Sequence, residues 1–204
     1  LFMSIRRISF ALSTKQLQIM LICGVLIALH WVFFFHAVKV SNVSVTLSVM
    51  SAGALVTALI EPIFYKRSFV WHEIVLGLIV VVALGLIMQT EYHYIEGMMF
   101  AFIAIMLSVA FTLINGKTIH KSDARVMSVY QLGAGAVCLS MILLMKGKLT
   151  VELFSVSKTD ILWISLLAIV CTAYAFVVSI AVMRHITPFS VSYTHLTLPT
   201  NLSV

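Results

Sequence analysis

The residues best suited to chemistry in this sequence lie inside long apolar stretches or at their ends. His30 falls near the middle of an uncharged run, with Trp31 beside it and Phe34 one helical turn later. A titratable imidazole at that depth is costly and marks a functional site by default, where it would bind polar groups of a ligand or carry a proton. The alternative is a neutral histidine that forms a hydrogen bond with a neighbouring helix.

Glu61 continues directly from an apolar stretch, and Pro62 follows it. Proline removes one helix hydrogen bond and can kink the end of a helix. The carboxylate has two interpretations. It would form a purely structural ion pair with Lys66 or Arg67, or it would make and break such pairs as a gate when the surrounding helices move.

Three further polar residues, Asn115, Thr172 and Tyr174, lie in later apolar stretches. Polar groups in lipid seek protein partners, so helix packing explains them as well as a ligand path does. The sequence has no paired carboxylates within the apolar runs, no His-rich cluster and no C-x-x-C, and its three cysteines lie in apolar runs. We therefore expect no catalytic residues, no metal, no cofactor and no disulfide.

The elements that position these residues are six long uncharged runs. Of the 204 residues, 62% are hydrophobic and 10% are charged, whereas soluble domains have about 25% charged residues. A helix crosses a hydrocarbon layer of roughly 30 Å with about 20 apolar residues. None of the runs alternates as barrel strands do, so the predicted fold class is all-α, a polytopic transmembrane helical bundle. Its spans are expected at about 19–38, 40–60, 74–90, 97–116, 126–145 and 161–183.

The basic residues predict the orientation. Six spans divide the 13 Lys and Arg residues between two sides, with four on one side (Lys39, Lys146, Lys148 and Lys158) and nine on the other. The richer side is cytoplasmic by the positive-inside rule, which places the start of the chain inside. The expected membrane is a bacterial-type inner membrane. The net charge is +6, but no cluster of basic residues in the sequence is longer than three. It therefore indicates contact with the lipid bilayer, and we expect no nucleic-acid partner.

An internal similarity links the ends of the first and sixth runs. FFFHAVKVSNVSV and VVSIAVMRHITPFSV each end a predicted helix, turn and re-enter the membrane, about 145 residues apart. This offset corresponds to five spans, so the two copies would cross the membrane in opposite directions, as in the inverted repeats of secondary transporters. Chance similarity between two apolar helix ends is the alternative.

These residues carry a family resemblance. ALHWVFFFHAVKVSNVSVTLSVMSAGALVTALIEP resembles the third and fourth helices of EamA-type transporters of the drug/metabolite transporter (DMT) superfamily, in which a small-residue turn precedes a helix that ends in Glu-Pro. CTAYAFVVSIAVMRHITPFS is similar to the eighth helix and the start of the ninth. The resemblance covers roughly residues 1–190 and implies ten helices built as five plus five, of which six complete spans are present here.

The resemblance implies a secondary transporter that works by alternating access, expected to be an exporter of small metabolites or drugs, amino acids among them, with protons as the expected coupling ion. The substrate path would include His30, Trp31, Phe34, Asn115, Thr172 and Tyr174, and the gate Glu61 and Pro62. Basic residues occur only at span ends, which disfavours phosphorylated substrates. The alternatives are a membrane-embedded enzyme and a non-transporting assembly subunit.

The two ends of the chain carry separate expectations. Residues 1–18 are expected to be the end of a missing helix and a cytoplasmic loop, and 19–190 the EamA-like transmembrane region. Without the family's first helix, which lines the substrate cavity, we expect the chain to be inactive alone. The final segment, VSYTHLTLPTNLSV (191–204), resembles a translated transposase-end adapter from sequencing libraries and is expected to be non-biological.

Overall fold

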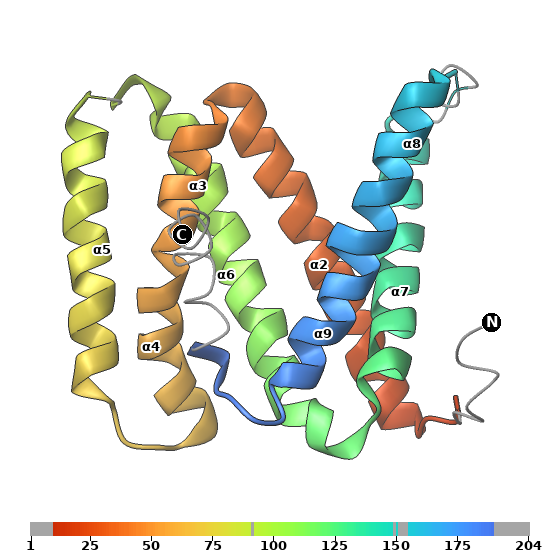
Figure 1. Cartoon of the computed structure of the whole chain (residues 1–204), viewed down its shortest axis with the longest axis horizontal. Helices are drawn as coiled ribbons and strands as arrows, with labels where there is room; N and C mark the ends of the chain where they lie inside the picture. Colours follow the sequence, from red (N-terminus) through yellow and green to blue (C-terminus); the bar gives the residue numbers. More distant parts are fainter. Residues whose placement is uncertain (1–9, 91, 149, 151–154, 190–204) are drawn as a thin grey trace, which may run out of the picture. The chain divides into compact units, whose positions relative to one another are not determined.

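The computed structural model describes residues 10–90, 92–148, 150 and 155–189 (Figure 1). All regular structure in these ranges is helical, which confirms the predicted all-α class. Five helices or runs of consecutive helices are long and apolar enough to cross a membrane, as a membrane protein requires: Thr14–Val40, Val43–Tyr65, Ile95–Lys121, Ala124–Met145 and Lys158–Val182. The tail at 191–204 and the first half of the expected leading segment, 1–9, lie outside the described residues.

The chain forms two compact units, which are described separately. Unit 1 comprises Leu1–Ala28 and Lys117–Arg184, and unit 2 comprises Leu29–Gly116 and His185–Val204. Helix α2 (Thr14–Val40) contributes its first half to unit 1 and its second half to unit 2. It begins inside the segment that the sequence predicted as a loop, because Ser13 accepts the first helical hydrogen bond, from Leu17.

Unit 2 contains α3 (Val43–Ser51), α4 (Gly53–Tyr65), α5 (Trp71–Thr90), η1 (Tyr92–Tyr94) and nearly all of α6 (Ile95–Thr118). Its buried core joins the end of α2, α3 and one face of α6, through Ala37, Val45, Val49, Met98, Ala101, Ile105, Val109 and Leu113. Helix α5 packs along α4 (Figure 1). Gly77 permits this approach, since a Cβ there would lie 2.7 Å from the Cβ of Leu55.

The second predicted span is two helices in the structure. Asn42 accepts a hydrogen bond from the Val45 N–H and so caps the start of α3. The break before α4 falls at Ala52, whose N–H bonds to the carbonyl of Val49, three residues earlier, instead of the carbonyl four residues earlier. Gly53, which follows, has a weak helix propensity. Helix α4 then continues through Pro62 to Tyr65, although proline removes one helix hydrogen bond.

Unit 1 contains the start of α2, η2 (Ile119–Lys121), α7 (Ala124–Met145), α8 (Lys158–Leu166), the π-helical segment η4 (Leu167–Tyr174) and α9 (Ala175–Val182). Helices α2 and α7 meet at glycine, because a Cβ on Gly24 would lie 2.5 Å from the Gln131 carbonyl oxygen. Asp123 caps α7 by accepting from the Arg125 N–H, and the Arg125 guanidinium donates to it at 2.8 Å. Helix α9 packs against α7.

Candidate functional site

The carboxylate of Glu61 is the best-connected polar group at the end of a span in unit 2. It lies in the last turns of α4 and is 2% exposed. Its Oε1 accepts from Arg67 Nη2 at 3.0 Å, and its Oε2 accepts from the backbone N–H of Phe189 at 2.8 Å. The charge therefore holds together two segments that are 128 residues apart in the sequence.

Arg67 bridges this carboxylate to the next helix. The same Nη2 donates at 3.2 Å to Glu73 Oε2 in the first turn of α5. Burial opposes the charged form of the guanidinium, but hydrogen bonds and charge attraction from the two carboxylates outweigh it and raise the pKa of Arg67. Glu61, Arg67, Glu73 and the Phe189 N–H are called the latch below.

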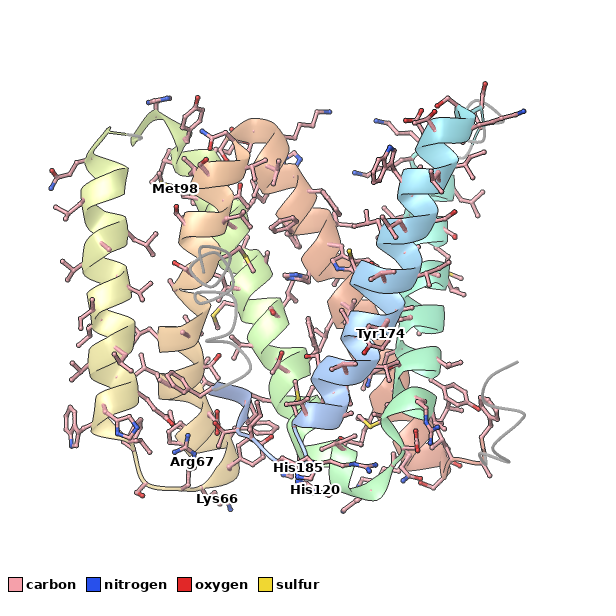
Figure 2. The ribbon with its side chains drawn as sticks, in the orientation of Figure 1. Lys66, Arg67, Met98, His120, Tyr174 and His185 are labelled. Atoms are coloured by element: carbon pink, nitrogen blue, oxygen red, sulfur yellow. The ribbon has the colours of Figure 1, made fainter. Side chains whose placement is uncertain are left out.

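The structure selects Arg67 from the two ion-pair partners that the sequence left open for Glu61. Lys66 occupies the C-cap of α4 in the left-handed conformation, with φ of 54°, and its side chain is exposed. The N–H groups of Lys66 and Arg67 both reach the carbonyl of Pro62, so the chain reverses at this point. The reversal brings the guanidinium of Arg67 back to the helix end (Figure 2).

Apolar packing surrounds the latch. Phe189 is buried against Ala54 and Ala58 of α4, with Ile74 beside them. At the same end of α4, the Tyr65 hydroxyl donates to the Leu113 carbonyl at 2.7 Å. The latch is thus a small ionic cluster with apolar side chains on one side, in which each hydrogen bond to a charged group contributes about 1.5–3 kcal/mol. The charged groups of the latch are held by hydrogen bonds and ion pairs, which can form and break reversibly.

His30 lies half-buried between aromatic rings in unit 2. Its Nδ1 is 2.8 Å from the Ala104 carbonyl oxygen on α6. A carbonyl can only accept, so Nδ1 carries the proton. The ring stacks on Phe34 at a centroid distance of 6.2 Å and meets the edge of Phe111 at 5.9 Å. The hydrogen bond to a neighbouring helix, one of the two interpretations from the sequence, is therefore present, and a second role in binding stays a prediction.

The other predicted substrate-path residues fall in both units. In unit 2, Trp31 is half-buried and Asn115 is 1% exposed, one turn beyond Phe111 on α6. In unit 1, Thr172 and Tyr174 lie on the π-helical η4, where Thr172 is half-buried and the Tyr174 side chain is 67% exposed (Figure 2). The structure thus brings His30 and Phe34 together, and His30 also contacts Phe111 on the face of α6 that carries Asn115.

Sequence reasoning missed two parts of the latch. In the sequence, Glu73 is only the residue before the predicted span 74–90. Its position six residues after Arg67, across a short turn, could have indicated the ion pair between the two. Phe189 donates through its backbone N–H, a group that the sequence does not distinguish. Only Pro188 before it was a signal, because proline is common at the first position of a helical turn, where backbone N–H groups have no partner within the helix. In the part of the chain that the structure describes, no group of three or more His, Cys, Asp or Glu residues is placed to hold a metal.

Comparison with known proteins adds no relative. No protein-family model, curated protein or solved structure matches the chain. Any function assigned to this molecule therefore has to come from its own residues and their geometry.

Proposed function

We propose that this chain belongs to a secondary transporter of the EamA kind, which exports small metabolites or drugs across the inner membrane by alternating access. The observation that supports this most is the latch. A buried carboxylate at the end of a span holds a residue of the following loop and a backbone N–H from the far end of the chain. Such a contact can break and re-form as a unit.

The energy of the latch fits a gate. Two or three charged hydrogen bonds at about 1.5–3 kcal/mol each amount to several kcal/mol, which is the scale on which a ligand shifts a conformational equilibrium. A ligand that binds the open state more tightly by that amount would open the latch. Pro62 adds to this role, since its missing N–H leaves the last turns of α4 with one hydrogen bond fewer.

The substrate would lie on the path that includes His30, Trp31, Phe34, Asn115, Thr172 and Tyr174. His30 offers hydrogen bonding and proton exchange between aromatic faces, which suits small neutral or zwitterionic molecules such as amino acids. The apolar spans contain no Lys or Arg away from their ends, so no basic side chain would be available there to bind the phosphate of a phosphorylated substrate.

Flux in proteoliposomes tests this proposal. The protein, expressed from its uninterrupted reading frame, is reconstituted into liposomes preloaded with unlabelled amino acids, and counterflow of the labelled compounds is measured. We expect saturable counterflow that Arg67→Gln reduces at least tenfold. Lys66→Gln is the matched control, because it removes the neighbouring charge outside the latch and should leave counterflow within twofold.

The rival functions predict other results. A membrane-embedded enzyme would convert a labelled compound instead of exchanging it, and an assembly subunit would show neither activity. Absence of counterflow for neutral, zwitterionic and drug-like compounds alike, from protein shown to be folded by its thermal unfolding, would overturn the proposal. His30→Gln should weaken the response of flux to a pH gradient, and an unchanged response would remove protons from the account.

A further inference from the structure

Unit 1 contains an apolar groove that the transport proposal does not use. The groove has a volume of about 530 Å³ and lies between the start of α2 and one side of α7. On α7 it follows two adjacent rows of residues spaced by four: Val129, Gly133, Val137 and Met141 form one row, and Tyr130, Ala134, Cys138 and Ile142 form the other. Leu21 and Val25 of α2 form the opposite wall.

Small residues leave this groove open. A Cβ on Gly133 would meet no other atom within 4 Å, so nothing within the described chain fills the space beside it. From Val129 to Ile142 the groove extends along α7 by roughly 20 Å, at about 1.5 Å per residue. A single leaflet of the hydrocarbon layer is about 15 Å deep. The groove is therefore long enough for one acyl chain that starts at the predicted cytoplasmic surface.

The end of the groove toward the start of α7 is strongly basic. Gln16 of α2 donates to the Lys121 carbonyl at 3.3 Å and to the Ser122 hydroxyl at 3.2 Å, and Arg184 donates to the Ser122 carbonyl at 3.0 Å. Four basic residues therefore belong to this loop or to segments bonded to it. Lys121 and Arg125 flank Ser122, Arg184 donates to it, and Lys15 is the residue next to Gln16. The single acid among them, Asp123, is already paired with Arg125.

Tyr130 connects the apolar and basic parts. Its ring lines the groove and its hydroxyl donates to the Phe10 carbonyl at 3.1 Å. Tyrosine in this position, apolar on one side and polar at the tip, is typical of residues at the level of lipid headgroups. Arg125 continues the row that begins with Val129, one turn closer to the start of α7.

We propose that this groove is a binding site for an anionic phospholipid, with one acyl chain along α7 and the headgroup phosphate among Lys15, Lys121 and Arg184. Charge complementarity selects this occupant, because an apolar groove alone would accept any lipid or helix, whereas a net-positive end favours an anionic headgroup. The site is independent of transport and would be present in a non-transporting protein.

Native mass spectrometry of the delipidated protein tests the site. The protein is titrated with phosphatidylglycerol and with phosphatidylethanolamine that carry identical acyl chains. We expect tighter binding of phosphatidylglycerol, by tenfold or more, and a loss of about fivefold for each of Lys15→Gln and Lys121→Gln. Lys146→Gln and Lys148→Gln, at the other end of α7, are the matched controls and should change nothing.

Gly133→Leu tests the groove itself. The residue has room for a side chain, so the variant should fold normally and reduce the binding of both lipids by filling the space. Equal affinity for the two lipids, or full binding by Gly133→Leu, would overturn the proposal. A dimer peak that Gly133→Leu abolishes would also overturn it, in favour of a second copy of the chain as the occupant.

Discussion

The energetic coupling between Glu61 and Arg67 is the most direct prediction of the latch. We consider a double-mutant cycle with Glu61→Gln, Arg67→Gln and the combined variant. Glu61→Gln keeps an oxygen that can accept from the Phe189 N–H, and Arg67→Gln keeps a polar side chain at the turn. The cycle therefore isolates the charge pair from the rest of the latch.

The magnitude follows from the geometry. At 3.0 Å and an effective dielectric constant near 20, the two charges attract each other by about 5–6 kcal/mol. Desolvation of the buried carboxylate offsets much of this attraction, and Glu73 continues to hold Arg67 in the absence of Glu61. We expect a net coupling of about 2 kcal/mol, within the range of 0.5–3 kcal/mol measured for contacting residues.

Equilibrium unfolding in mixed micelles, followed by tryptophan fluorescence, measures the free energy of unfolding of each variant. The control cycle pairs Glu61→Gln with Lys66→Gln, whose charge is adjacent in sequence but exposed, and should give a coupling below about 0.5 kcal/mol. The reasoning fails if the Glu61–Arg67 coupling is no larger than the control, because the latch would then be only a juxtaposition of charges.

Three further predictions concern stability. Gly24→Ala should destabilise the protein by about 1–3 kcal/mol, because the new Cβ would lie 2.5 Å from the α7 backbone. Gly85→Ala in α5 is the control and should cause no loss of stability, because its Cβ would have no atom within 4 Å. Equal shifts in the thermal unfolding temperature of the two variants would refute the packing of α2 on α7. Lys66→Gly should stabilise by about 1 kcal/mol, since glycine has no Cβ to strain at a φ of 54°, and Lys66→Ala should not, as chemical unfolding can check. The hydrogen bond from Arg125 lowers the pKa of Asp123 to about 2 from its usual value near 4. This carboxylate therefore contributes stability above pH 4 that is lost as the pH falls toward 2; thermal unfolding of Asp123→Asn, which keeps a capping oxygen, should lack this component.

The all-helical fold was predictable because length and apolarity are local properties of the sequence. Each of the six runs lies in a helix or in consecutive helices. The boundaries were less accurate where a tertiary or single-residue effect decides, as at Ser13 before α2 and at Pro62, which α4 passes. The break at Ala52 and the π-helical η4 went unpredicted, since Leu-Ala-Ile-Val-Cys-Thr-Ala-Tyr has no residue that distinguishes a π-helix from an α-helix.

Within the candidate site, Glu61 was predictable from the sequence, but the groups that bind it were not. The position of Glu61 at the end of an apolar run identified the carboxylate. The choice between Lys66 and Arg67 depends on a left-handed residue that is lysine and not glycine, so no turn signal marked it. The Phe189 donor depends on a contact across 128 residues, which periodicity and spacing cannot supply.

The sequence could likewise identify His30 as a buried titratable group but could not name its acceptor. The acceptor is the backbone carbonyl of Ala104, a group that every residue carries and that no sequence pattern distinguishes. The aromatic neighbour Phe34 was visible from helical spacing on the same element. Phe111, on another helix, was not.

Locking the latch and measuring flux is the most direct test of the central claim. Ala58 and Phe189 pack in one buried cluster beside Glu61, so cysteines at these two positions, with Cys23, Cys138 and Cys171 replaced by serine, should be joined by a short reducible cross-linker. The reduced double variant and the single Ala58→Cys variant are the controls. We predict that cross-linking stops counterflow in proteoliposomes and that reduction restores it. Counterflow that continues at the same rate through cross-linked protein would contradict the account.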